Sequence, residues 1–270
     1  MKKFGIFSMV AALALTATIG FAGCSTTSET SGSSQVAEDN SLQKIKDSGK
    51  FILGLDATFK PMGYTDENDQ IVGFDIDLAK EVAARLGVEF KAQPIDWDAK
   101  EMELSTGKID CIWNGLTITP EREEALALTK AYLNNDQVLV VRNDGAIKTL
   151  ADAAGKKVGI QSGSSAQDAV EANPDFKASL KELVAFRENL TALNDLETRG
   201  IDGVVMDSIV AAYDIAQSGK PLTIVTEVLA KEGYGIAFRK NDIKLRDAVQ
   251  STLEEMAKDG TVEAISKKWF

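Results

Sequence analysis

Short apolar runs alternate with segments of helical spacing along the first half of the chain. Residues 74–86 carry apolar side chains on one helix face, namely Leu78, Val82, Ala83 and Leu86, and Gly87 follows as a stop signal. Comparable patterns predict strands over 51–55, 88–94 and 109–113 and helices over 98–106 and 123–128. Strands that alternate with helices are typical of a mostly parallel α/β sheet.

The second half repeats this alternation. It predicts strands over 137–141, 157–160, 201–206, 222–225 and 234–238, and helices over 149–154, 166–171, 189–198, 242–258 and 261–269, with a further helix that Asp207 caps and Gly219 ends. The plan of 107–114 also returns in 200–207: a glycine, an Ile-Asp pair, an apolar strand and a polar end. This echo suggests two similar lobes. Ligands of open α/β sheets bind beyond the carboxyl ends of the strands, so we expect Asn114 and Asp207 to meet at one cleft.

Residues 114–122 join a strand end to a helix start. Gly115 lets a ligand approach the backbone, Thr119 is a good N-cap and Pro120 a good first helical residue. Free N–H groups and a helix N-terminus favour an anion, and the planar fork of Arg122 suits a carboxylate. The alternative is a surface arginine in a capped first turn.

The composition narrows the function classes. The net charge of −11 argues against nucleic acid as a partner. The chain has no histidine, which removes the commonest general base and the commonest zinc ligand. We therefore expect neither a metal nor a cofactor.

The first 23 residues have the parts of a secretory signal. Lys2 and Lys3 precede a mostly apolar run, and small residues lead directly to Cys24. This end resembles a lipobox, in which Cys24 becomes lipidated and anchors the protein to the membrane outside the cytoplasm. A transmembrane anchor, or an ordinary signal with an incidental cysteine, are the alternatives. Residues 24–41 are rich in Ser, Thr and Gly and indicate a flexible tether. Cys111 has no partner for an internal disulfide.

From about residue 42 to 270 the chain resembles the polar amino-acid-binding proteins of bacterial ABC transporters, solute-binding protein family 3. The resemblance starts from the 114–122 stretch and includes further motifs in the same order. It implies a two-lobed periplasmic-binding-protein fold of type II, with a ligand cleft between the lobes and a two-strand hinge. Residues 42–135 and 230–270 would form lobe 1 and residues 136–229 lobe 2. A monomer that delivers an L-amino acid to an ABC permease is then expected.

The resemblance also implies roles for single residues. Arg122 would grip the α-carboxylate, helped by N–H groups near Thr117 and Ser164 and by the Thr117 hydroxyl. Asp207 suits the ammonium, which would also contact the Gly115 carbonyl and the Thr117 hydroxyl. The alternative for Asp207 is that it serves only as the N-cap of a helix. Phe59 and Trp97 would form aromatic walls, although such residues are more often core. The positions that would select the ligand side chain are Asp56, Asn114, Gln161 and Ser165.

These residues predict capture by hinge closure, without a chemical step. Two carboxylates in the cleft disfavour glutamate and aspartate, whereas basic, glutamine-like and cystine-like ligands stay open. One alternative is a sensory lipoprotein that keeps the cleft but feeds no transporter. The other is a cyclohexadienyl dehydratase on the same scaffold, for which no residue stands out as the general acid.

Overall fold

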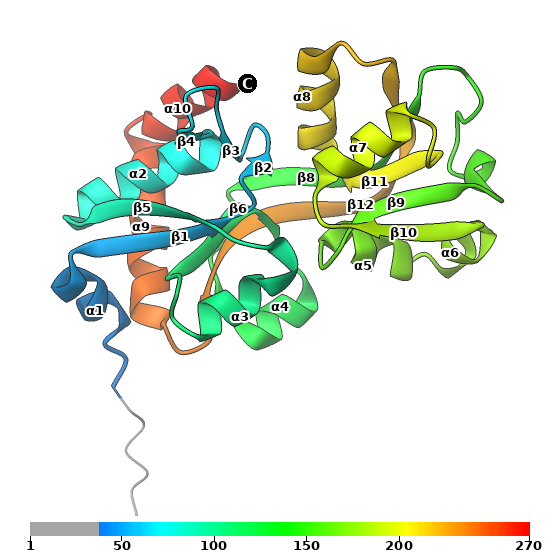
Figure 1. Ribbon diagram of the computed structural model, residues 1–270. Helices are drawn as coiled ribbons and strands as arrows, with labels where there is room; N and C mark the ends of the chain where they lie inside the picture. Colours follow the sequence, from blue (N-terminus) through cyan, green and yellow to red (C-terminus); the bar gives the residue numbers. More distant parts are fainter. Residues whose placement is uncertain (1–37) are drawn as a thin grey trace, which may run out of the picture. The chain divides into compact units, whose positions relative to one another are not determined.

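Strands and helices alternate in the computed structural model, which describes residues 38–270 (Figure 1). The strands are β1 (Lys50–Leu55), β2 (Thr58–Phe59), β3 (Gly63–Thr65), β4 (Ile71–Val72), β5 (Glu89–Pro94), β6 (Cys111–Thr117), β7 (Leu126–Leu128), β8 (Leu133–Arg142), β9 (Lys157–Gln161), β10 (Glu182–Phe186), β11 (Gly203–Asp207) and β12 (Leu222–Arg239). The helices are α1 (Ser41–Ser48), α2 (Phe74–Leu86), α3 (Lys100–Ser105), α4 (Pro120–Ala125), α5 (Ser165–Glu171), α6 (Pro174–Ser179), α7 (Asn189–Glu197), α8 (Ser208–Ser218), α9 (Ile243–Lys258) and α10 (Thr261–Trp269), with 3₁₀ turns η1 (Trp97–Ala99) and η2 (Ala151–Ala153).

One sheet of the described residues has the order β10-β9-β11-β8-β12-β6-β1-β5, and β7 pairs with β12. Two groups of parallel strands lie at its ends: β5, β1 and β6 form one, and β10, β9 and β11 the other. The antiparallel pair β8 and β12 joins them. We call the part around β5, β1, β6 and β7 the first lobe and the part around β9, β10 and β11 the second lobe.

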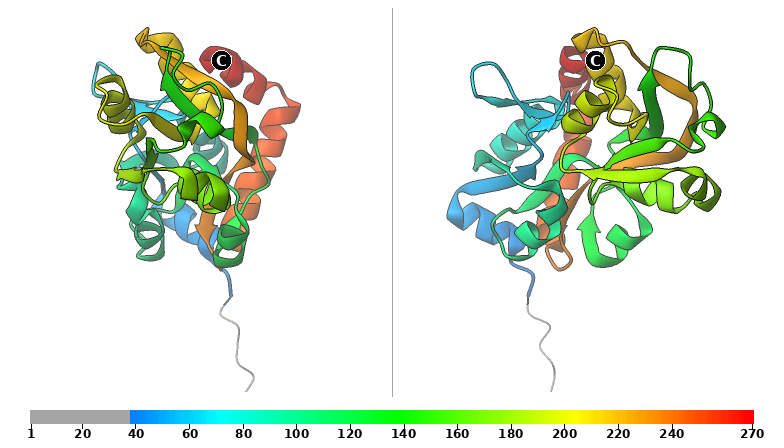
Figure 2. Two further views of the ribbon diagram at one scale, coloured as in Figure 1. Left: turned by 90° about the vertical axis from the view of Figure 1, so that its right-hand side faces the viewer. Right: turned by 45° about the vertical axis from the view of Figure 1, so that its right-hand side comes forward.

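Helices cover both faces of each parallel group, and the inner strands β6 and β11 are therefore buried, whereas the edge strands β5 and β10 are partly exposed. Every residue of β6 and of β11 is buried. In the second lobe, α7 and α8 lie on one side of the sheet and α5 and α6 on the other (Figure 1). In the first lobe, α9 contacts α1 and α2, and α10 contacts α2. Figure 2 shows these C-terminal helices, in orange and red, beside the blue and cyan start of the chain.

The hinge predicted from the resemblance corresponds to β8 and β12, which pair along most of their length. The sequence predicted two separate strands, 222–225 and 234–238, and this was wrong because β12 is continuous. Its pairing with β8 is irregular between Ile224 and Ala230, so this stretch lacks the alternation that marks a strand.

Two further corrections concern the first lobe. The helix predicted over 123–128 begins earlier and ends at Ala125, because Leu126–Leu128 forms β7 against β12. Residues 114–117 were expected to be a loop with free N–H groups, yet they complete β6. The N–H of Gly115 donates to Oδ2 of Asp75 at 2.8 Å. Local sequence could not identify β12 or Asp75 as partners of this stretch, because both lie far away along the chain.

Most other predicted elements are confirmed within a few residues, and α2 has the predicted bounds. The sequence pattern missed α1, α6, β2, β3, β4 and β10. Ser41, placed at the end of the tether, is a buried residue of α1. The predicted signal, Cys24 and the tether up to residue 37 lie outside the described residues. The lobe boundaries at 42–135, 136–229 and 230–270 stay predictions.

Within residues 38–270, no helix has the length and apolarity needed to span a membrane. In the same part of the chain, no three or more acidic, cysteine or histidine side chains gather in a way that could hold a metal ion. Cys111 is a free, buried cysteine in β6, and burial raises the pKa of its thiol.

Candidate functional site

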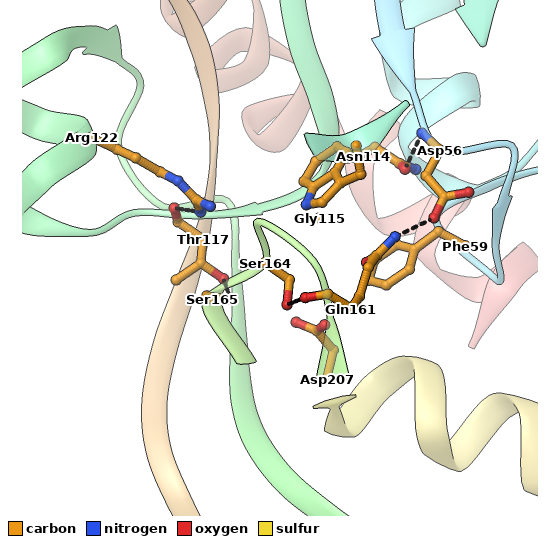
Figure 3. Close-up of a pocket in the computed structure, with 11 residues that line it drawn as sticks. Asp56, Phe59, Asn114, Gly115, Thr117, Arg122, Gln161, Ser164, Ser165 and Asp207 are labelled. Atoms are coloured by element: carbon orange, nitrogen blue, oxygen red, sulfur yellow. Dashed lines mark hydrogen bonds between the residues drawn. The ribbon is translucent and has the colours of Figure 1, made fainter. Parts of the chain in front are cut away.

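All eleven residues that the sequence singled out line one cavity between the two lobes (Figure 3). The first lobe contributes residues after β1, in β2, η1 and β6, and in α4: Asp56, Phe59, Trp97, Asn114, Gly115, Thr117 and Arg122. The second lobe contributes residues at the ends of β9 and β11 and at the start of α5: Gln161, Ser164, Ser165 and Asp207. Strand ends and helix starts from both lobes therefore converge, as expected for an open α/β sheet.

Arg122 lies at one end of this cavity on the short helix α4. Thr119 caps that helix, since its hydroxyl accepts the N–H of Arg122 at 3.2 Å. The side chain turns inward and is only 6% exposed. Nη1 donates to the carbonyl oxygen of Thr117 at 2.8 Å (Figure 3). Nη2 lies 3.5 Å from the carbonyl oxygen of Gly163. Burial lowers the pKa of Arg122 from its usual value.

Asp207 is the negative group of the cavity and is 5% exposed. It occupies the predicted N-cap position of α8, but its side chain makes no cap hydrogen bond. Its Oδ1 instead accepts Nδ2 of Asn135 at 2.7 Å, Nε2 of Gln137 at 3.0 Å and the hydroxyl of Tyr234 at 2.8 Å. Burial, and then the negative charge of Glu232, raise the pKa of Asp207 to about 7.

Strand register brings this polar group together. Thr117 pairs with Tyr234 across β6 and β12, Glu232 with Asn135 across β12 and β8, and Gln137 with Asp207 across β8 and β11. Opposite residues of antiparallel strands, and residues two apart on one strand, point to the same face. The six side chains therefore form a row on one face of the sheet beneath the cavity.

The end of the cavity away from Arg122 is built around Asp56. Oδ1 of Asp56 accepts the N–H and the hydroxyl of Thr58, and Oδ2 accepts Nε2 of Gln161 at 2.8 Å. Oδ1 of Asn114 accepts the N–H of Asp56 at 3.0 Å, which fixes the orientation of that amide. Nδ2 of Asn114 is buried with no partner among the described residues. This end thus combines a carboxylate with side-chain amides.

The two lobes touch each other around the cavity. Besides Gln161 and Asp56, Oγ of Ser165 donates to Oγ1 of Thr117 at 2.9 Å, and Nζ of Lys100 donates to the carbonyl oxygen of Gly163 at 2.8 Å. All eleven lining residues are buried. The structure is therefore a closed arrangement of the lobes.

Several residues that contact the cavity walls were missed from the sequence. They are Asp75, Lys100, Asn135, Gln137, Asn189, Glu232 and Tyr234. Lys100 is buried beside the ring of Trp97, and burial followed by the charge of Arg122 lowers its pKa to about 8. In the sequence it looked like an ordinary helix lysine. The polar run before the apolar part of β8, which contains Asn135 and Gln137, was the one available signal.

The chain matches the bacterial extracellular solute-binding proteins, family 3, over residues 51–270. It is 30% identical over 236 residues to the L-cystine-binding protein TcyJ of Escherichia coli, covering 87% of each chain. It is 32% identical over 225 residues to the arginine-binding extracellular protein ArtP of Bacillus subtilis, covering 82% of this chain and 86% of ArtP.

A solved structure shares the fold. It is an ABC uptake transporter substrate-binding protein of Streptococcus pneumoniae with bound histidine, with a TM-score of 0.83 and 38% identity. The match covers 86% of this chain and 96% of that one. The two-lobed fold inferred from the sequence is thereby confirmed. The chain belongs to the bacterial extracellular solute-binding proteins, family 3.

Proposed function

We propose that this protein captures a polar, basic or cystine-like L-amino acid by closure of its two lobes. The observation that carries the proposal is a pair of opposite charges on the cavity. Arg122 and Asp207 are both buried, and neither forms a salt bridge with any residue in the range 38–270. A buried charge without a counter-charge is costly. The carboxylate and ammonium of an amino acid supply both counter-charges.

The rest of the cavity suits the side chain of such a ligand. Phe59 and Trp97 offer apolar surface, while Asp56 and Gln161 offer an acceptor and an amide. Asp56 and Asp207 disfavour an acidic ligand. The similar proteins are named for cystine, arginine or histidine. These ligands belong to the classes that we propose, which are basic, glutamine-like or cystine-like amino acids.

Delivery and anchoring complete the proposal. The protein acts as a monomer outside the cytoplasm, is held to the membrane by lipidated Cys24 and hands its ligand to an ABC permease. Cys24→Ala tests the anchor, because it should move the protein from the membrane fraction to the soluble fraction. A sensory lipoprotein with the same cleft would bind equally well. Loss of ligand uptake on deletion of the protein distinguishes transport from sensing.

The first experiment is thermal melting of the purified protein against the twenty amino acids and cystine. A ligand that binds the folded state raises the melting midpoint according to RT ln(1 + [L]/Kd). We expect a shift with one chemical group of amino acids, absent in Arg122→Ala and retained in Arg199→Ala, an exposed arginine that does not line the cavity. A shift that survives Arg122→Ala would refute the carboxylate clamp. Turnover of prephenate or arogenate would support the dehydratase alternative instead.

A further inference from the structure

One carboxylate oxygen beneath the cavity is surrounded by hydrogen-bond donors from both lobes and from the hinge strand β8. Oε2 of Glu232 accepts the hydroxyl of Thr117 at 2.8 Å and Nε2 of Gln137 at 3.0 Å. Nδ2 of Asn135 and Oγ of Ser165 each lie 3.3 Å away from it. Thr117 belongs to the first lobe, Ser165 to the second, and the two amides to β8. Glu232 itself is on β12 and does not line the cavity.

These contacts decide what the Thr117 hydroxyl can offer to a ligand. A hydroxyl has one proton, and a carboxylate oxygen can only accept. The proton of Thr117 is therefore committed to Glu232. Oγ of Ser165 lies 2.9 Å from Oγ1 of Thr117 and donates to it. Toward the cavity, the Thr117 oxygen is thus left as an acceptor.

An acceptor at this point discriminates between the two ends of an amino acid. It forms a favourable hydrogen bond with an ammonium and faces a carboxylate oxygen as acceptor to acceptor. Asp207 lies in the same row of side chains and also accepts only. By contrast, the opposite charge, Arg122, donates only. The orientation of the ligand is then fixed by the hydroxyl as well as by the two charges.

We propose that Glu232 is a positioning residue for the ligand, which holds the Thr117 hydroxyl as an acceptor and so makes this end of the cavity specific for an α-ammonium group. The inference rests on the proposed function, because it presumes an amino-acid ligand. A plain structural role for Glu232 would be to tie β8 to β12. Loss of such a tie would weaken the binding of every ligand alike. Loss of a positioning residue would weaken only the binding of ligands that carry an α-ammonium group.

The test compares amino acids with analogues that lack the α-ammonium. The pairs are L-arginine with 5-guanidinopentanoate, L-histidine with 3-(imidazol-4-yl)propanoate and L-glutamine with glutaramate. Titration calorimetry on Glu232→Met, which has no oxygen to accept the Thr117 proton, should show affinity for the amino acid reduced roughly tenfold to a hundredfold, the range for a hydrogen bond to a charged group. Affinity for the analogue should change far less, and Glu232→Gln, which keeps an accepting oxygen, should lose less than Glu232→Met. Glu227→Met is the matched control, since Glu227 is an exposed residue of β12 whose carboxylate accepts the N–H of Leu150.

A pH profile reports a separate effect of Glu232, namely its charge acting on Asp207, which does not depend on the Thr117 hydroxyl. The charged and titratable groups that act on Asp207 are Glu232 and Tyr234 on β12 and Arg122 on α4. The negative charge of Glu232 raises the pKa of Asp207, so Glu232→Met lowers it. The pH at which amino-acid affinity declines should then move to lower values. Where an analogue binds the wild-type protein too weakly to titrate, the double-mutant cycle with Thr117→Val decides whether Glu232 acts through the hydroxyl.

A double-mutant cycle locates the effect. Thr117→Val removes the hydroxyl with little change in shape, and Glu232→Met should add little in that background if it acts through Thr117. Equal losses for amino acid and analogue, or additive losses in the double variant, would overturn the positioning role, as would no loss at all. If the wild-type protein binds no amino acid, the proposed function itself fails. That result differs from the others because it appears before any substitution is made.

Discussion

Nε2 of Gln161 donates a hydrogen bond of 2.8 Å to Oδ2 of Asp56. The donor lies at the end of β9 in the second lobe and the acceptor just after β1 in the first, so the bond crosses the cleft. Oε1 of the same Gln161 accepts Nδ2 of Asn189 at 3.0 Å, which orients the amide toward Asp56. The end of the cavity around Asp56 thus also helps to hold the lobes together.

Removing this bond should favour open conformations of the ligand-free protein. Gln161→Ala leaves Asp56 without one of its donors in the closed state, and a hydrogen bond to a charged group contributes about 1.5–3 kcal/mol. We expect a larger radius of gyration by small-angle X-ray scattering without ligand. Gln217→Ala, at an exposed site on α8, is the control. An unchanged radius in Gln161→Ala would show that other contacts set the closed state.

Gly115 should tolerate no side chain. Its φ is +61°, and a Cβ there would lie 2.7 Å from Cε1 of Phe59 and 3.2 Å from the ring of Tyr234. Gly115→Ala should therefore lower the free energy of unfolding and displace Phe59 from the cavity wall. Gly155→Ala separates backbone strain from the clash with Phe59 and Tyr234, because Gly155 has a φ of +70° but open space around its Cβ position.

Urea unfolding measures both glycine variants. Backbone strain alone costs about 1–3 kcal/mol, and Gly155→Ala should lose only that amount. Gly115→Ala should lose more and should also weaken ligand binding. Equal losses in the two variants, with binding intact, would show that Phe59 and Tyr234 can move aside freely.

The pH dependence of stability should differ between wild-type protein and Asp207→Asn. The pKa of Asp207 is about 7 in the folded protein, against an ordinary value of 3.8. Because the folded pKa is the higher one, the stability linked to its proton is fully present below about pH 4 and is lost as pH rises through about 7. The difference in unfolding free energy between wild type and Asp207→Asn should therefore change across this window, in favour of the wild type at the acidic end.

Ligand affinity should follow the opposite trend. An ammonium needs the ionised form of Asp207, so affinity should fall as pH drops below about 7, with release of a proton on binding. Calorimetric titrations in buffers of different ionisation heat detect that proton. Affinity that is constant from pH 5 to 8 would mean that Asp207 is not the partner of the ammonium.

Asp75 should be needed behind the cavity wall. It is fully buried, its Oδ2 accepts the N–H of Gly115 at 2.8 Å and its Oδ1 accepts the hydroxyl of Tyr132 at 2.8 Å. Asp75→Ala leaves both donors unpaired, at about 1–3 kcal/mol for each buried group. Asp75→Asn keeps an oxygen for Gly115 and should lose less. Glu81→Ala, at a half-exposed ion pair on the same helix, should lose under about 1 kcal/mol in the same unfolding assay.

Local signals were sufficient for much of the fold, and the family resemblance was sufficient for the residues that line the cavity. α2 has a clear apolar face and a glycine stop, and the Thr119-Pro120 start of α4 follows from capping chemistry alone. The cavity residues were recognisable because Arg122 and its neighbours occur together in one short stretch that resembles a known family.

The supporting residues could not be predicted, because their roles depend on pairing between distant segments. Glu232 lies in a stretch without strand alternation and becomes significant only when β12 places it opposite Asn135. Asp75 looked like an ordinary acidic residue in the first turn of a helix. In the structure it is buried against Gly115, and burial raises its pKa to about 7.

β12 also constrains the order in which the molecule can assemble. It lies between β6 and β8, so Ile112 finds its partner Ala237 only after the whole second lobe has been made. Contacts this distant form late, because a long loop must close first. A chain emerging from its N-terminus can build the continuous second lobe early, while the lobe that carries Arg122 waits for its missing strand. A chain that terminates before β12 would therefore fail to complete the fold of the first lobe, even though Arg122 had already been synthesised.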